Sequence, residues 1–141
     1  MLYGAEIWGF NKVNSLEVVQ NKFLKYALKL KTNTHTAMIL LETGFLPVKV
    51  EVQVRMINFW VNLLTGRQDK LSYKFYIICL SLYKRKLIIF DWLKQIETII
   101  NYAGFTFVFQ SQLQLDKKYL RNTFLPQIKK CFERSSYTRA L

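Results

Sequence analysis

The sequence predicts an all-α protein, an irregular bundle of about six helices packed around one long central helix at residues 47–66. In that segment the polar residues recur at spacings of 4, 3, 4 and 3, which places them on one narrow stripe of a helix. The stripe consists of Glu51, Arg55, Asn58, Asn62 and Thr65. The alternating valines from Val48 to Val54 would favour a strand if taken alone, but the longer pattern favours a mostly buried helix.

Both ends of the central helix carry a residue typical of a helix boundary. Pro47 suits the first helical position because its missing N–H would be unpaired there, and Gly66 suits the residue after the last turn. Only Lys49 and Gln53 interrupt the apolar faces. Hydrophobic residues make up 51% of the 141 residues, which is enough for a packed core in a single helical domain.

A first amphipathic helix is expected from Asn14 to Lys31, with Asn14 and Glu17 as a capping box. Its apolar face is expected to lie in the core. This face comprises Leu16, Val19, Phe23, Tyr26, Ala27 and Leu30.

A second face of the same helix is basic. Lys22, Lys25 and Lys29 follow one another at spacings of 3 and 4. At the helical rise they would form a positive stripe about 10 Å long. Such a stripe could contact successive phosphates of RNA or DNA; a solvated face is the alternative interpretation of the same pattern.

A shorter helix is expected from Thr34, which can cap it, to Gly44, where a left-handed residue can end it. His35 is the only histidine and lies at the start of this helix. Because no Cys or acidic residue stands at ligand spacing, His35 is interpreted as a capping or surface residue rather than a catalytic or metal-binding one.

The segment Leu71–Tyr83 is nearly all apolar, and its length predicts a buried helix with Asp69 available as its cap. Directly after it comes the sharpest basic cluster of the chain, Lys84, Arg85 and Lys86, a second candidate for phosphate contacts. Aromatic residues flank the cluster: Tyr73, Tyr76, Tyr83, Phe90 and Trp92. Rings beside cations are typical of sites for single-stranded nucleic acid, although aromatic residues at helical spacing belong more often to a core.

Asp91 is expected to cap a helix that reaches Ala103 and is ended by Gly104. The apolar side of this helix comprises Trp92, Ile96, Ile99 and Ile100. The residues that follow, Phe105 to Gln110, are expected to form a short extended connection.

The last helix is expected to begin near Asp116. Its buried side would comprise Leu120, Phe124, Ile128 and Cys131. An interior proline costs about 3 kcal/mol, so Pro126 predicts a kink, or a break into two short helices of which Pro126 opens the second. Residues 135–141 are polar and are expected to fray.

The charge of the chain is strongly positive. Lys and Arg number 21 against 9 Asp and Glu, a net charge of +12. Residues 1–66 hold 7 basic and 4 acidic residues, whereas residues 67–141 hold 14 and 5. This excess favours polyanionic partners, and the alternative is a charged surface that keeps an apolar protein in solution.

Catalytic chemistry is not indicated. Enzymes that use two metal ions need neighbouring carboxylates, whereas Asp69, Asp91 and Asp116 are isolated in the sequence, each where a helix cap is expected. No glycine-rich phosphate loop and no HExxH, GxSxG or CxxC string occurs. We therefore expect no catalytic residue, no metal site, no cofactor and no small-molecule ligand.

Cys79 and Cys131 are too few and too far apart for a disulfide framework and are expected to be reduced core thiols. No apolar run approaches the roughly 18 residues of a membrane span. The N-terminal string MLYGAEIWGF lacks a basic region, so we expect an intracellular protein, nuclear or cytoplasmic. The chain also starts inside an apolar segment with no cap before it, as expected of a fragment of a larger polyprotein.

Several short strings carry a family resemblance. They are LYGAEIWG at residues 2–9, Asn21-Lys22-Phe23, Glu42-Thr43-Gly44 followed by Pro47, Arg55-Met56 with Phe59-Trp60, Lys70-Leu71-Ser72, Trp92 and Gly104. In order and spacing they resemble the region downstream of the polymerase core in reverse transcriptases of non-LTR (LINE-type) retrotransposons. The likeness runs from Leu2 to about Gly104 and more weakly to Phe132.

The resemblance implies the thumb end and following connection of a larger reverse transcriptase, a helical region that helps to hold template and primer. The polymerase domain with its catalytic aspartates would lie upstream and would be a partner of this segment. None of the catalytic motifs of the family is present here, so no catalytic residue is carried over.

Two other interpretations remain open. The chain could be an inactive structural remnant of a retroelement whose apolar residues, Leu2, Tyr3, Ile7 and Trp8 among them, await a missing partner domain. It could also attach peripherally to an anionic membrane through Leu82–Ile89.

Overall fold

The computed structural model describes the backbone of residues 3–140 and the side chains of residues 3–135. The described residues form an all-α fold without strands, as predicted. The helices are α1 (Ala5–Trp8), the 3-10 turn η1 (Gly9–Asn11), α2 (Val13–Ala27), α3 (Thr36–Thr43), α4 (Val48–Thr65), α5 (Leu71–Lys84), α6 (Asp91–Tyr102), α7 (Thr106–Gln110), α8 (Lys117–Tyr119), the π-helical turn η2 (Leu120–Phe124) and α9 (Leu125–Ala140).

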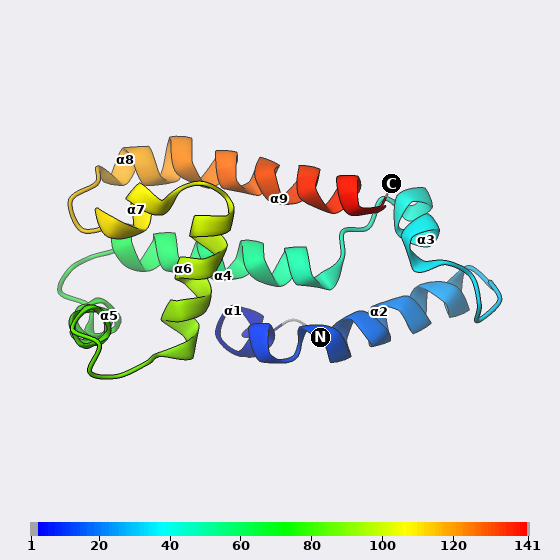
Figure 1. Cartoon of the computed structure of the whole chain (residues 1–141), viewed down its shortest axis with the longest axis horizontal. Helices are drawn as coiled ribbons and strands as arrows, with labels where there is room; N and C mark the ends of the chain where they lie inside the picture. The colour runs from blue at the N-terminus through cyan, green and yellow to red at the C-terminus, as the bar shows by residue number, and fades with distance from the viewer. Residues whose placement is uncertain (1–2, 141) are drawn as a thin grey trace.

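Helix α4 is the centre of the fold, as the sequence predicts. Figure 1 shows α9 running along one side of α4, α1 and α2 on the other side, and α6 crossing it. Its fully buried side chains include Val52, Met56, Ile57, Trp60 and Val61. The alternating valines therefore belong to a helix and not to a strand.

A buried polar network joins α4 to two other segments. The Trp60 Nε1 donates a hydrogen bond to the Tyr76 hydroxyl at 2.8 Å, and that hydroxyl donates to Gln112 Oε1. The Gln112 amide in turn donates to the Phe109 carbonyl at 2.8 Å. Each polar atom named in this network has a hydrogen-bond partner, so none of them is buried unpaired. The network therefore holds α5 and the segment after α7 against the core.

The first turn of α4 differs slightly from the prediction. Pro47 lies one residue before the helix rather than in it. The N–H of Val48, which has no partner within α4, is capped from another helix, because Gln20 Oε1 accepts its hydrogen bond at 3.1 Å while Gln20 Nε2 donates to the Leu46 carbonyl at 3.0 Å. Gln20 therefore fixes the first half of α2 against the start of α4.

The last turn of α4 is held by two cations that the sequence placed in the basic C-terminal region. Arg121 Nε donates to Thr65 Oγ1 at 2.9 Å, and Lys117 Nζ donates to the Gly66 carbonyl at 3.4 Å. Positive charge is favourable at a helix C-terminus. These two residues have structural partners, and Thr65, the last residue of the predicted polar stripe, is buried.

Gly9 allows the N-terminal segment to approach α4 closely. A Cβ atom at this position would lie 2.9 Å from the Cγ1 of Val52, closer than packed carbon atoms can come. Trp92 also holds this segment, since its Nε1 donates to the Glu6 carbonyl at 2.8 Å. The first residues of the described chain thus pack between α4 and α6.

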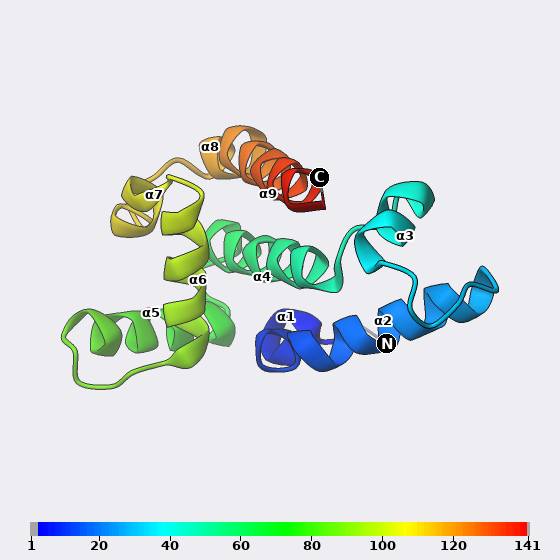
Figure 2. The ribbon, with the colours of Figure 1, turned by 45° about the vertical axis from the view of Figure 1, so that its right-hand side comes forward.

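The predicted core face of α2 is wrong except at Leu16. Only Leu16 and Leu24 of this helix are buried. The exposed residues include Val19, Phe23, Tyr26 and Leu30. The second half of α2 extends beyond the end of α4 in both views of the ribbon, and α3, which lies beside it, leaves these four side chains exposed (Figures 1 and 2).

Helix α5 was likewise predicted to be buried and is not. Tyr76 and Leu80 are its only buried residues, because α5 packs on α4 with one side and faces solvent with the other. Its first turn is not capped by Asp69, whose carboxylate instead pairs with Arg67 at 2.7 Å. Cys79 is half-buried, Cys131 of α9 is exposed, and both cysteines are free. The free thiols agree with the prediction, whereas the exposure of Cys131 does not agree with a place in the core.

Four other local predictions are wrong. Residues 105–110 are not extended, because Thr106–Gln110 form α7 and bury Val108 and Phe109. The capping residues of α2 and α6 are Lys12 and Phe90, and neither Asn14 nor Asp91 caps with its side chain. Similarly, α3 begins after His35, without a side-chain cap from Thr34.

Pro126 produces a π-helical turn. The ring of a proline clashes with the carbonyl four residues earlier, here that of Asn122, and cannot donate to it. The widened turn Leu120–Phe124 contains that carbonyl, and α9 starts at Leu125 directly after it. The expected break therefore takes the form of a change in helix type.

The last helix begins where the sequence predicts, but the set of buried residues on it differs from the prediction. Asp116 caps α8, since its Oδ1 accepts from the N–H of Lys118 at 3.3 Å. Among the side chains of α9 that the structure describes, Ile128 and Phe132 are buried, whereas Cys131, which was predicted to be buried, is exposed. The backbone of α9 continues to Ala140, and Leu141 lies outside the described residues, so fraying of residues 135–141 stays a prediction.

Candidate nucleic-acid interface

The six predicted phosphate contacts lie at two opposite ends of the molecule. Lys22 and Lys25 belong to the exposed half of α2, and Lys29 follows that helix. Lys84 ends α5, and Arg85 and Lys86 start the loop after it. Figures 1 and 2 show these two helix ends on opposite sides of α4. The six predicted residues therefore belong to two separate groups, one at each of these helix ends.

The end of α2 is a Schellman turn with a lysine at its left-handed position. Lys29 has a φ angle of 52°, its N–H donates to the Tyr26 carbonyl at 3.1 Å, and the N–H of Leu30 donates to the Lys25 carbonyl at 2.9 Å. Lys29 is therefore outside the helical stripe on which the sequence placed it. Lys25 is also engaged, since its Nζ donates to the Thr32 carbonyl at 2.7 Å.

The end of α5 repeats this geometry. Lys86 has a φ angle of 57° and donates to the Tyr83 carbonyl at 3.0 Å, while Leu87 donates to the Leu82 carbonyl at 3.2 Å. The same turn ends α6 with Gly104, for which a positive φ costs nothing. Both candidate basic sites thus contain a lysine in a backbone conformation that costs an L-residue roughly 1 kcal/mol.

The aromatic residues around Lys84–Lys86 are mostly part of the core. Burial raises the pKa of Tyr76 above its ordinary value, and its hydroxyl lies in the network with Trp60. Tyr83 is half-buried and donates to Glu97 Oε2; partial burial and then this hydrogen bond raise its pKa to about 12. The ring of Trp92 packs edge-on against Phe59, with 5.9 Å between the centroids. These rings are held by protein contacts, which favours the core interpretation.

Exposed rings beside lysines occur on α2 instead. Phe23 is 65% exposed and Tyr26 is 84% exposed, although the sequence assigned both to the core. Lys22 and Lys29 are exposed on the same part of the chain. Residues 18–41 contain no Asp or Glu. The exposure of Phe23 and Tyr26 could not be predicted from the sequence, because periodicity predicts an apolar face without showing which element covers it.

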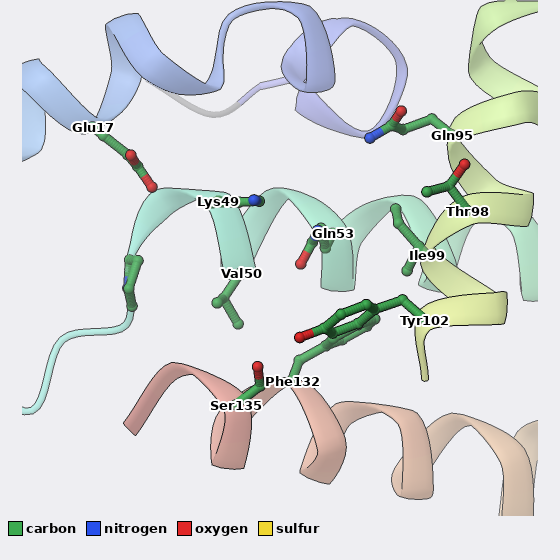
Figure 3. A pocket seen from close by; sticks show the side chains of 11 residues that line it. Glu17, Lys49, Val50, Gln53, Gln95, Thr98, Ile99, Tyr102, Phe132 and Ser135 are labelled. Atoms are coloured by element: carbon green, nitrogen blue, oxygen red, sulfur yellow. The ribbon is translucent and has the colours of Figure 1, made fainter. Parts of the chain in front are cut away.

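A groove of about 410 Å³ lies between α2, α4, α6 and α9 (Figure 3). Lys49 and Gln53, which interrupt the apolar faces of α4, both line it, together with Tyr102 of α6 and Phe132 of α9. These two polar residues therefore have a place at the surface of the groove rather than in the core. Its volume is in the range of small-ligand sites, and the absence of a small-molecule ligand stays a prediction.

Carboxylates are dispersed in the described part of the chain. Asp69 pairs with Arg67, Asp116 caps α8, and Asp91 opens α6. Within the described residues no three His, Cys, Asp or Glu side chains come together as a metal site would require. His35 is exposed just before α3. The expectation of a non-catalytic protein is neither tested nor changed by this arrangement.

No helix within the described chain has the length and apolar character needed to cross a bilayer.

Comparison of the chain with protein-family models, with curated proteins and with solved structures found no significant match.

Proposed function

We propose that the chain is a non-catalytic nucleic-acid-binding segment whose contact with an unpaired strand is made by the exposed half of α2. The observation that carries this proposal is the exposure of Phe23 and Tyr26 beside Lys22 and Lys29. Bases of any sequence can stack on exposed rings, while ammonium groups neutralise the neighbouring phosphates. The contact would therefore be largely independent of base sequence.

The family resemblance supports an accessory role. If the chain corresponds to the region downstream of the polymerase core in a non-LTR retrotransposon reverse transcriptase, an upstream polymerase domain would carry out bond formation. The segment described here would then help to hold the template or primer strand. Its net charge of +12 suits that role.

The left-handed conformation of Lys29 separates its side chain from that of Lys25. At φ 52°, Lys29 leaves the axis of α2 and begins the turn to α3, so its side chain does not lie directly above Lys25. We infer that Lys22 and Lys29 contact phosphates, whereas Lys25 stabilises the turn through Thr32. This division predicts different effects for the three lysines.

Binding to an unstructured oligouridylate at several salt concentrations tests the proposal. The double variant Lys22→Gln, Lys29→Gln should lower the salt slope by about 0.7 for each lost phosphate contact of a single strand. The double variant Phe23→Ala, Tyr26→Ala should weaken binding by about 1–3 kcal/mol per stacked base and leave the slope unchanged. Lys130→Gln and Phe107→Ala are matched exposed controls on α9 and α7. Equal effects of the controls would remove α2 from the site.

A second candidate function is favoured by the same exposed surface. Tyr3, Ile7 and Trp8 are exposed, as are Val19 and Phe23 of α2; Leu2 lies outside the described residues. This is the arrangement expected of a structural segment that a missing partner domain would cover. Concentration-dependent self-association and binding of a hydrophobic dye, without any affinity for RNA, would favour this candidate over nucleic-acid binding.

A further inference from the structure

Helix α5 has an apolar stripe on the side opposite its buried side. Leu71, Phe75 and Ile78 follow at spacings of 4 and 3 and are all exposed, Leu71 by 83%. At 100° per residue the buried residues Tyr76 and Leu80 lie about half a turn away from this stripe. A second apolar face without a partner is not required for packing on α4, so it calls for another explanation.

The loop after α5 extends the apolar surface. Leu87, Ile88 and Ile89 are three consecutive exposed aliphatic residues, and Ile89 is 71% exposed. In Figures 1 and 2 helix α5 and this loop lie at one edge of the molecule. No other described element covers them.

The charges around this surface have a single sign. Residues 70–90 contain five Lys or Arg and no Asp or Glu. Lys84 and Lys86 also line a hollow of about 570 Å³, together with Ile88, Ile89 and Gln110. Glu97 lines the same hollow, but its carboxylate accepts the hydrogen bond of Tyr83. Cations beside aliphatic side chains in one hollow match a lipid whose anionic headgroup adjoins an acyl chain.

We propose that α5 and residues 85–90 form a docking surface for an anionic lipid bilayer. Leu87, Ile88 and Ile89 enter the boundary between headgroups and acyl chains, and the stripe of α5 lies along the interface. Lys84 and Lys86 hold a phosphate headgroup in the hollow. Apolar burial and electrostatic attraction act together here, and reversible membrane binding needs both.

The chemistry of the exposed side chains favours lipid over nucleic acid at this end of the molecule. Aliphatic residues gain free energy by leaving water for an acyl layer, whereas they offer no face on which a base can stack. Next to Lys84–Lys86 the exposed apolar residues 87–89 are all aliphatic, whereas the exposed apolar residues at the end of α2 include two rings, Phe23 and Tyr26. The two basic helix ends therefore fit different polyanions.

Co-sedimentation of the full chain with vesicles tests this proposal. The chain should bind vesicles of phosphatidylcholine with phosphatidylserine, and not vesicles of phosphatidylcholine alone. The double variant Leu87→Ser, Ile89→Ser should lower the partition coefficient about tenfold. Met38→Ser on α3, an equally exposed apolar position at the other end of the molecule, should leave it unchanged.

The charged residues are tested in the same assay. Lys84→Gln and Lys86→Gln should each lower partition about fivefold, whereas Lys130→Gln on α9 should have little effect. The α2 variant Lys22→Gln, Lys29→Gln should bind vesicles normally, which separates this proposal from nucleic-acid binding by α2. Circular dichroism melts confirm that each variant is folded.

Two results would overturn the proposal. One is an unchanged partition coefficient for Leu87→Ser, Ile89→Ser, which would mean that the basic chain merely adsorbs to charge. The other is loss of oligouridylate affinity by Lys84→Gln, Lys86→Gln with no measurable vesicle binding by the unmodified chain. That outcome would assign this surface to nucleic acid.

Discussion

Helices α4 and α2 are both long amphipathic helices, yet they end in opposite environments. The apolar side chains of α4 are enclosed by α1, α2, α5, α6 and α9, whereas the second half of α2 extends beyond α4 and has α3 beside it, which leaves Phe23 and Tyr26 exposed (Figure 1). Trp60 of α4 is fully buried, and Phe23 of α2 is exposed. The difference teaches that an apolar face indicates a helix, while the neighbouring elements decide whether that face becomes core.

The polar groups around α4 also differ from those at the outer ends of α2 and α5. Around α4 they pair with one another, as Trp60, Tyr76 and Gln112 do. At the ends of α2 and α5 the backbone groups pair within tight turns, and the lysine side chains point to solvent or to the turn itself. The interior therefore has little tolerance for change, and the outer helix ends should tolerate much more.

The largest difference is expected between two aromatic truncations. Trp60→Ala should lower the free energy of unfolding by about 3–5 kcal/mol, because it removes a fully buried ring that packs against Phe109 and Phe124. Phe23→Ala should change it by no more than about 0.5 kcal/mol. Urea unfolding followed by circular dichroism measures both. A comparable loss in Phe23→Ala would show that α2 is covered in solution, for example by self-association.

A smaller difference is expected between two tyrosines. Tyr76→Phe should destabilise the fold by about 1–3 kcal/mol, because the Trp60 N–H loses its acceptor and Gln112 loses its donor inside the core. Tyr26→Phe removes a hydroxyl from an exposed ring and should have no measurable effect. Equal stability of the two variants would mean that water enters the Trp60 network.

Glycine at the left-handed lysines should stabilise the protein. Lys29→Gly and Lys86→Gly each remove the strain of a positive φ and should raise the free energy of unfolding by up to about 1 kcal/mol. Lys22→Gly lies inside α2 and should lower it by about the same amount. Thermal melts of the three variants decide this. A stabilising Lys22→Gly would indicate that the second half of α2 is not helical in solution.

The smallest effect is expected from Tyr83, at the boundary between the two regions. Its pKa is raised from 10.0 to about 12 in the folded protein. Between these values the unfolded chain binds fewer protons than the folded one, so the free energy of unfolding should fall as the pH rises from about 10 to 12. Tyr83→Phe should show a shallower fall in urea titrations across this range and no such difference near pH 8. An identical pH dependence would mean that neither burial nor the hydrogen bond to Glu97 raises the pKa of Tyr83 in the folded protein.

Part of the candidate interface could be predicted and part could not. The basic clusters were found because charge is visible in the sequence, and Lys84–Lys86 do follow a helix as expected. The left-handed positions of Lys29 and Lys86 were missed, because glycine is the usual signal for such a turn and both positions carry lysine. The exposed rings of α2 were missed because the covering elements, not the spacing, determine exposure.

The sequence by itself determined the all-α class, the central helix to within one residue of each end, the left-handed turn at Gly44, the end of α6 before Gly104 and the cap at Asp116. These features depend on local physics: helical periodicity, the conformational freedom of glycine and hydrogen bonds over a few residues. Only the tertiary structure decided which apolar faces are buried, that Gln20 caps α4 and that α2 and α5 expose theirs. Burial depends on contacts between residues distant in the chain, and the pattern within one helix does not specify its neighbours.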